Sequence, residues 1–243
     1  MTSYLRADRL LVERGLFESR AKAQAAIEAG LISADGMTVR KAAEELPLNA
    51  RLNAVPAHPY VSRGGVKLAA ALDSFGFDPH GRVCLDVGAS TGGFSQVLLE
   101  RGAVKIYAID VGREQLHASL RACPEIVTLE ETDIRTLSPA LLDPQPDFVT
   151  VDVSFISLKL VLPAALALAK PRAQLVALIK PQFEAGRGAL KKGIVRDAAM
   201  REAVCNDIVG FVSSLGWRVL GTVPSPITGG DGNVEFLLGA TRD

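Results

Sequence analysis

Beyond residue 62, short runs of apolar residues alternate with longer segments in which apolar residues recur at helical spacing. This alternation predicts a parallel sheet covered by helices on both faces. The five apolar runs that we interpret as parallel strands are residues 83–87, 105–110, 126–129, 148–152 and 175–179. A helix over residues 197–215 precedes two further runs, 217–220 and 234–238, which predict a hairpin-like edge. The pattern therefore predicts an α/β domain with a seven-stranded sheet.

The first sixty residues predict a smaller α+β unit. Apolar residues outline two short helices, the first starting near Leu5 and the second capped by Ser19 and ended by Gly30. Asp35-Gly36, between two short apolar runs, is a typical hairpin turn. Prolines mark a linker near residues 55–62, so we expect domains at residues 1–60 and 61–243.

Composition narrows the class of protein. A chain of 243 residues with 48% apolar content can bury a sizeable core. Its longest apolar stretch, residues 158–169, contains Lys159 and Pro163 and falls short of the ~18 residues that a membrane-spanning helix needs. With Arg6, Asp8 and Arg9 among its first ten residues, the chain lacks the uncharged apolar region of a secretory signal, so we expect a cytoplasmic protein.

The charge balance and the spacing of cysteine and histidine residues do not point to a particular binding site. The chain has 27 basic and 27 acidic residues, and residues 1–60 have 8 against 7, so a nucleic-acid site would have to come from clustering on one face. The three cysteines and three histidines are scattered, without the spacing of a metal site. We therefore expect no metal.

A glycine-rich turn is the most informative local motif. It follows the first strand of the larger domain and opens a helix, the context in which glycines let the backbone approach a nucleotide. Its spacing matches neither a phosphate-binding loop nor the usual dinucleotide pattern. The residues that we expect to bind a cofactor here are Asp86, Gly88, Ala89, Ser90, Thr91, Gly92, Gly93 and Phe94, with Asp86 either orienting the loop or lying near the charged end of the cofactor.

Two acids further along are consistent with an adenosine-bearing ligand. Asp110, followed by Val111, ends the second strand, where a carboxylate can accept ribose hydroxyls. Asp133, followed by Ile134, comes after the third strand and could receive an adenine amino group. Either aspartate alone is more often a helix cap or a loop residue.

Several motifs carry a resemblance to a known family. They are residues 61–68, the glycine turn, and residues 151–158, 179–184 and 232–236. In these the larger domain resembles the FtsJ-like ribose methyltransferases, and nearly the whole chain resembles the TlyA family. The resemblance implies a Rossmann-like class I methyltransferase fold, S-adenosylmethionine as cofactor, and a catalytic tetrad of Lys67, Asp152, Lys180 and Glu235.

The tetrad is chemically reasonable without the family. Asp152 and Lys180 end two consecutive predicted parallel strands, whose carboxyl ends meet at one edge of a sheet. A ribose hydroxyl must lose its proton to attack, and a neutral Lys180 amine could accept it as general base. For that role the pKa of Lys180 has to fall below its reference value of ~10.4. Burial, or the nearby positive charges of Lys67 and the cofactor, would lower it by favouring the uncharged amine. Asp152 and Glu235 would then position the lysines and the hydroxyl.

The smaller domain resembles the S4-like RNA-binding fold through residues 19–23 and 29–32, although Asp35-Gly36 stands where the family often has Asn-Gly. The candidate RNA-binding residues are Arg6, Arg9, Arg20, Lys22, Arg40, Lys41 and Arg63. Phe155 and Phe183 could stack on an extruded base. The resemblance implies cytidine 2′-hydroxyls in ribosomal RNA as substrate, with the large subunit favoured.

Two other functions remain open at this point. Members of the TlyA family are also described as haemolysins, but the strands are too short and too continuously apolar for a membrane barrel, and no basic amphipathic helix is present. A catalytically silent RNA-binding or ribosome-assembly factor could keep the fold. The presence of all four tetrad residues argues against it.

Overall fold

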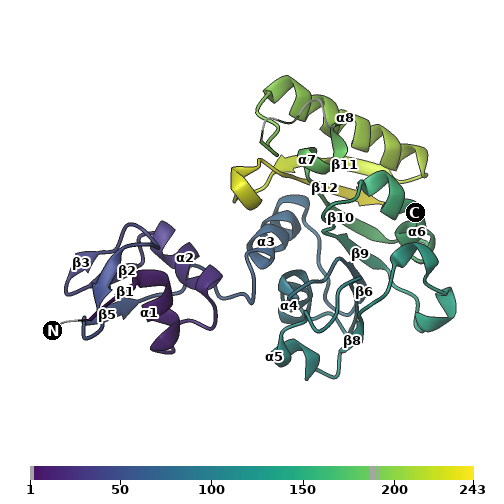
Figure 1. Ribbon diagram of the computed structural model, residues 1–243. Coiled ribbons are helices and arrows are strands. Elements are labelled where there is room, and N and C mark those ends of the chain that lie inside the picture. The colour runs from purple at the N-terminus through teal and green to yellow at the C-terminus, as the bar shows by residue number, and fades with distance from the viewer. Residues whose placement is uncertain (1–2, 187–189, 191) are drawn as a thin grey trace. The chain divides into compact units, whose positions relative to one another are not determined.

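A computed structural model describes residues 3–186, 190 and 192–243. The chain forms two compact units, Met1–Pro59 and Tyr60–Asp243 (Figure 1).

The N-terminal unit combines two helices with five short strands. Its elements are β1 (Tyr4–Arg6), α1 (Ala7–Glu13), α2 (Arg20–Glu28), β2 (Ile32–Ala34), β3 (Met37–Thr38), β4 (Glu45–Pro47) and β5 (Leu52–Ala54). The strands form a three-stranded sheet in the order β3-β2-β5 and a separate β1-β4 pair, all antiparallel. Leu10, Leu11, Phe17, Ile27 and Ile32 are among the residues of its hydrophobic core.

Local chemistry explains the second helix and the hairpin. The Ser19 hydroxyl accepts a hydrogen bond from the Lys22 amide at the start of α2. Asp35 and Gly36, both with positive φ, form the turn between β2 and β3. The first helix starts later than predicted, because Leu5 lies in β1 and pairs with Leu46 of β4.

The C-terminal unit contains the central sheet. Its strands are β6 (Val83–Val87), β7 (Lys105–Ile109), β8 (Ile126–Leu129), β9 (Phe148–Val151), β10 (Gln174–Ile179), β11 (Arg218–Pro224) and β12 (Phe236–Thr241). Its α-helices are α3 (Gly64–Phe75), α4 (Gly93–Glu100), α5 (Ala118–Arg121), α6 (Leu158–Ala167), α7 (Pro181–Glu184) and α8 (Ala198–Ser214). Short 3₁₀ turns are η1 (Ile134–Thr136), η2 (Pro139–Leu141) and η4 (Gly230–Gly232).

The predicted seven-stranded α/β sheet is confirmed, with the order β11-β12-β10-β9-β6-β7-β8. The five strands from β10 to β8 are parallel to one another, whereas β12 is antiparallel to both β10 and β11. The last strand begins at Phe236, opposite Ile179, two residues later than predicted. Glu235 therefore lies just outside the strand, at the sheet edge where β10 ends.

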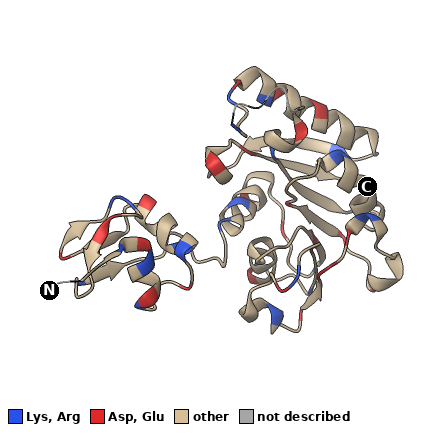
Figure 2. Ribbon diagram, in the orientation of Figure 1, with Lys and Arg blue, Asp and Glu red and all other residues tan. Residues whose placement is uncertain are grey.

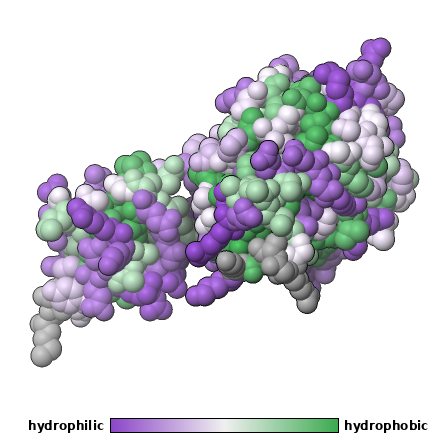
Figure 3. Space-filling view, turned by 90° about the horizontal axis from the view of Figure 1, so that it is seen from above, coloured by the Kyte–Doolittle hydropathy of each residue, from purple (hydrophilic) through white to green (hydrophobic). Residues whose placement is uncertain are grey.

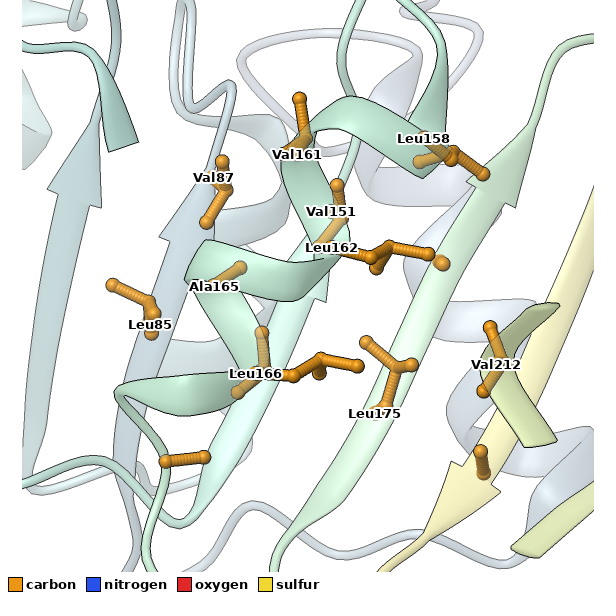
Figure 4. Packing of buried hydrophobic residues seen from close by; sticks show 14 of the residues in the cluster. Leu85, Val87, Val151, Leu158, Val161, Leu162, Ala165, Leu166, Leu175 and Val212 are labelled. Atoms are coloured by element: carbon orange, nitrogen blue, oxygen red, sulfur yellow. The ribbon is translucent and has the colours of Figure 1, made fainter. Parts of the chain in front are cut away.

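Hydrophobic packing holds this sheet against its helices. In Figure 4, Leu158, Leu162 and Leu166 of α6 lie against the strands that carry Leu85 and Leu175. Leu162 and Leu175 have no solvent-exposed surface. Each such side chain contributes about 1.5–3 kcal/mol when it is removed from water. The sheet is thus a rigid base for the loops at its edge.

The surface mixes polar and apolar residues. On the face seen in Figure 3, hydrophobic residues lie among hydrophilic ones in both units. Within the described ranges, no helix has the length and apolarity needed to cross a membrane.

Candidate active site

The topology brings three of the four tetrad residues to one edge of the sheet. Asp152 follows β9, and Lys180 follows the adjacent parallel strand β10. Because β12 is antiparallel to β10, its starting end lies at the same edge and carries Glu235. Lys67 comes from the first half of α3, which packs on the sheet near β10 and β12.

The four side chains form two ion pairs. Lys67 Nζ lies 2.5 Å from Glu235 Oε2, and Lys180 Nζ lies 2.6 Å from Asp152 Oδ1. Both lysines are only 8% exposed and Glu235 is 2% exposed. Buried lysines of this kind are uncommon unless they are paired, so the arrangement is more than a solvated surface cluster.

All four residues line one cavity of about 560 Å³. The glycine turn forms another part of its lining, through Gly88, Ala89, Ser90, Thr91, Gly93 and Phe94. Arg63, the one predicted RNA-binding residue of this unit, also lines the cavity. The predicted catalytic residues and most of the predicted glycine-turn residues therefore face one space.

The glycine turn has the backbone geometry that requires glycine. Gly88 has φ 82°, and a Cβ there would lie 2.4 Å from the backbone oxygen of Asp152. Gly92 has φ 94° at the start of α4, and a Cβ there would lie 2.4 Å from Leu120. Gly92 lines neither cavity, so it shapes the turn without facing the space for a ligand.

A second cavity, of about 510 Å³, adjoins the first. Its lining includes Asp110, Val111, Gln115, Asp133 and Ile134. The two cavities share five lining residues, which are Gly88, Ser90, Asp152, Ser154 and Phe155. Gln115 was not singled out from the sequence, because a lone glutamine in a loop carries no pattern.

The acids of the second cavity are held in place by hydrogen bonds. Asp110 accepts a hydrogen bond from the Ser90 amide at 2.8 Å and from the Gly112 amide at 2.7 Å, which links the ends of β6 and β7. The Arg135 side chain, with its backbone amide, lowers the pKa of Asp133 to about 2. The Asp133 carboxylate is therefore already engaged by Arg135.

Glu130 orders the loop that borders this cavity. Its carboxylate accepts hydrogen bonds at 2.8–2.9 Å from the backbone amides of Glu114, Gln115 and Leu116, and pairs with Arg121. The hydrogen bond from the Leu116 amide has the largest effect, and together these contacts lower the pKa of Glu130 to about 2. Glu130 could not be recognised from the sequence, because its pairing depends on how the loops after β7 and β8 meet.

Asp86 lies beneath the glycine turn and lines neither cavity. It is fully buried and accepts hydrogen bonds from Ser95 Oγ at 2.6 Å and Thr150 Oγ1 at 2.9 Å. This position fits the role of orienting the loop, one of the two that the sequence suggested. Burial raises the pKa of Asp86 to about 6, although the two hydroxyl hydrogen bonds oppose the rise.

The raised pKa of Asp86 predicts a pH-dependent stability. The folded protein binds this proton more tightly than the unfolded chain, in which an aspartate titrates near pH ~3.9. The contribution of Asp86 to the free energy of unfolding should therefore fall as pH rises from ~4 to about 6 and stay constant above. Urea denaturation of wild type and Asp86→Asn between pH 4.5 and 8 measures this difference. A difference independent of pH would contradict the prediction.

The cations predicted to bind RNA in the N-terminal unit differ in their surroundings. Arg6 and Arg20 share the buried carboxylate of Asp8, whose pKa the Arg6 side chain lowers well below its usual range. Lys22 pairs with Glu18. The exposed residues include Arg9, Arg40 and Lys41. Figure 2 shows basic and acidic segments interleaved on this unit.

Two aromatic residues of the first cavity, Phe155 and Phe183, lie close to each other. Phe155 is 91% exposed and has φ 65°, an unusual conformation for a residue with a bulky side chain. Its ring centroid lies 5.1 Å from that of Phe183, and both residues line the first cavity. Backbone strain of this kind concentrates at functional sites.

Across the described residues, no group of three or more His, Cys, Asp or Glu side chains could hold a metal ion.

Comparison with known proteins identifies the family. The model of the FtsJ-like methyltransferases matches residues 60–242. The chain is 43% identical over 241 residues to the 16S/23S rRNA (cytidine-2'-O)-methyltransferase TlyA of Mycobacterium tuberculosis (strain ATCC 25618 / H37Rv), covering 98% of this chain and 90% of that relative.

Two further relatives have a different kind of name. Hemolysin A of Brachyspira hyodysenteriae is 37% identical over 235 residues, covering 96% of this chain and 98% of the relative. A solved structure from Streptococcus thermophilus, also named as a hemolysin, matches with a TM-score of 0.79 at 39% identity, covering 100% of this chain and 90% of that one. With the family match and the seven-stranded fold, these similarities show that the chain belongs to the FtsJ-like methyltransferases and, within them, to the TlyA family.

Proposed function

We propose that this protein transfers the methyl group of S-adenosylmethionine to the 2′-hydroxyl of a cytidine in ribosomal RNA. The observation that carries the proposal is the pair of lysine–carboxylate contacts in one cavity, beside a second cavity lined by Asp110. The substrate class comes from the name of the TlyA relative. A ribosomal substrate would place the protein in the cytoplasm.

The residues present suit the proposed cofactor. Gly88 allows the glycine turn to pack closely against the backbone oxygen of Asp152, which a Cβ would approach to 2.4 Å, and Asp110 offers carboxylate oxygens to the adjoining cavity. Asp110, Val111, Gln115, Asp133 and Ile134 would hold the nucleoside part. Residues 88–91 and 93–94 would hold the amino-acid part. The bound cofactor would supply an electrophilic methyl group on a sulfonium sulfur.

The tetrad supplies the proton chemistry in this proposal. Lys180, which pairs with Asp152 as an ammonium, first gives a proton to water, and its uncharged amine then accepts the proton of the ribose hydroxyl as the oxygen attacks the methyl carbon. Asp152, 2.6 Å away, holds the amine in place, and the ammonium later returns its proton to water. The Lys67–Glu235 pair forms another side of the cavity and helps to align the hydroxyl.

RNA binding is divided between the two units. Phe155 offers an exposed ring on which an extruded base can stack, next to Phe183. We assign the N-terminal unit to the S4-like RNA-binding class, in which Arg9, Arg40 and Lys41 contact phosphates. Arg6 and Arg20 are preoriented by Asp8 and keep about half of their side-chain surface exposed.

The test uses the whole protein with labelled S-adenosylmethionine and separated, unmodified ribosomal subunits. The proposal expects label in RNA from at least one subunit, at the 2′-oxygen of a cytidine on mapping. RNA binding without label would support a catalytically silent assembly factor. Leakage of liposomes by purified, lipid-free protein, without label in RNA, would support the membrane-active alternative that the hemolysin names suggest.

The hydrogen bonds from the backbone amides of residues 114–116 to the Glu130 carboxylate, here called the Glu130 clamp, give a prediction about cofactor affinity. Glu130→Ala removes the acceptor for three backbone amides and frees the loop that carries Gln115. We expect the affinity for S-adenosylhomocysteine to fall by about 10-fold, since the ordering of the loop then has to occur on binding. Calorimetric titration measures it.

Glu202→Ala, at an exposed acid on α8, is the matched control and should bind as wild type does. An unaltered affinity in Glu130→Ala would refute the clamp. Because the pKa of Glu130 is about 2, the effect should be the same from pH 6 to pH 8.

A further inference from the structure

The Lys180 amine has two polar neighbours with different geometry. Lys180 Nζ donates a hydrogen bond to Ser154 Oγ at 2.8 Å. Asp152 Oδ1 lies at 2.6 Å as a charge partner, but it accepts no hydrogen bond of acceptable geometry from the residues described. The contact that fixes the direction of the amine is therefore the one with Ser154.

We infer that Ser154 is a positioning residue that aims the Lys180 amine at the ribose hydroxyl; this inference rests on the proposed function. A neutral amine has two N–H bonds and one lone pair in tetrahedral directions. One N–H bond is directed at Ser154, and the carboxylate of Asp152 attracts the second. The lone pair is then left to face the cavity that both residues line.

The reaction balances with this orientation. The proton of the hydroxyl moves to the lone pair of Lys180 as the new carbon–oxygen bond forms and the carbon–sulfur bond of the methyl donor breaks. The resulting ammonium keeps its contacts with Ser154 and Asp152, so the amine does not have to rotate during the transfer. General bases contribute most when they are held in this way before the reaction.

The segment that carries Ser154 is held at both ends. It follows β9 directly, and Phe155 turns the backbone with a positive φ. At its far end Glu184 accepts hydrogen bonds from the Ser157 hydroxyl at 2.5 Å and from the Leu158 amide at 2.8 Å. The segment after β10 thus contacts the segment after β9 at two places, through Lys180 at Ser154 and through Glu184 at Ser157 and Leu158. Because the segment is fixed at β9 and at Ser157, the Ser154 hydroxyl has a defined position.

Ser154 also lines the second cavity, so a direct contact with the cofactor is the competing role. The two roles differ in what a mutation changes. A residue that aims the base affects the rate of the chemical step, whereas a cofactor contact affects cofactor affinity.

The experiment compares Ser154→Ala and Ser154→Thr with wild type. It measures single-turnover methylation of unmodified ribosomal subunits at saturating S-adenosylmethionine, and S-adenosylhomocysteine affinity by calorimetry. We expect Ser154→Ala to be about 10- to 100-fold slower, with cofactor and subunit affinities within about twofold of wild type. Ser154→Thr keeps the hydroxyl and should recover most of the rate. Ser213→Ala, on α8 and outside the lining of both cavities, is the matched control with the wild-type rate.

Three results would overturn the inference. They are a wild-type rate in Ser154→Ala, a loss confined to cofactor affinity, and a Ser154→Thr variant as slow as Ser154→Ala although it binds cofactor normally. Lys180→Ala in the same assay separates this inference from the proposed function. If Lys180→Ala is inactive while Ser154→Ala is unimpaired, only the role of Ser154 fails. An inactive wild type would instead remove the proposed function.

Discussion

Replacing Lys180 with alanine is expected to abolish methyl transfer while leaving cofactor binding largely intact. The amine is the group that we assign to take the hydroxyl proton, and it lies in a cavity with Asp152 and Ser154 as its neighbours. Loss of a positioned general base slows a reaction by about 100- to 10,000-fold. The measurement is incorporation of labelled methyl into ribosomal RNA, with S-adenosylhomocysteine affinity determined in parallel.

Lys159→Ala is the matched control for this variant. Lys159 is a partly exposed lysine that pairs with Asp207 on α8, away from both cavities. Its loss should leave turnover unchanged, because surface ion pairs contribute only about 0–1 kcal/mol to stability. Undiminished turnover in Lys180→Ala would remove this lysine from the mechanism, and a large loss of cofactor affinity would assign it to binding instead.

Replacing Asp110 with alanine should weaken cofactor binding by about 10- to 100-fold. The variant loses the carboxylate proposed to accept ribose hydroxyls, and a hydrogen bond to a charged group is worth about 1.5–3 kcal/mol. It also leaves the amides of Ser90 and Gly112 without their acceptor, which loosens the join between the two loops. Calorimetric titration with S-adenosylhomocysteine measures the change.

Asp110→Asn helps to separate these two effects. The amide oxygen can still accept one hydrogen bond from the loops, while the negative charge is gone. An affinity between those of wild type and Asp110→Ala would indicate that both contacts matter. Wild-type affinity in Asp110→Ala would show that the second cavity does not hold the nucleoside.

Two relatives with hemolysin names are 37% and 39% identical to this chain, which itself matches the FtsJ-like methyltransferase family over residues 60–242. Figure 3 shows hydrophilic residues interspersed over the visible face of both units. The proposed methyl transfer gives the buried lysine–carboxylate pairs a direct chemical use.

Periodicity and turn chemistry were enough to derive the sheet and part of the site. Apolar runs of strand length appear at the central strands because a parallel sheet is buried on both faces. Asp152 and Lys180 could be assigned to one edge from the sequence, since parallel strands in one sheet end on the same side. The glycine turn was recognisable because Gly88 and Gly92 require backbone conformations that other residues rarely adopt.

Other features depended on how distant segments pack. Glu235 reaches Lys67 because β12 enters the sheet antiparallel to β10, with Phe236 opposite Ile179. The inward position of Asp86 depends on the hydroxyls of Ser95 and Thr150, which come from two other elements. A local pattern reports which face of a strand or helix is buried, but strand order and register decide the contacts across elements.

The hydrogen bond between Lys180 and Ser154 and the Glu130 clamp also depend on how distant segments pack. Each joins loops that follow different strands, and neither loop has a periodic pattern that would show its conformation in advance. The amino-acid pattern thus specifies the elements and supplies the reactive groups. Packing at the sheet edge sets the direction in which those groups point, because that direction depends on contacts between residues far apart in the chain.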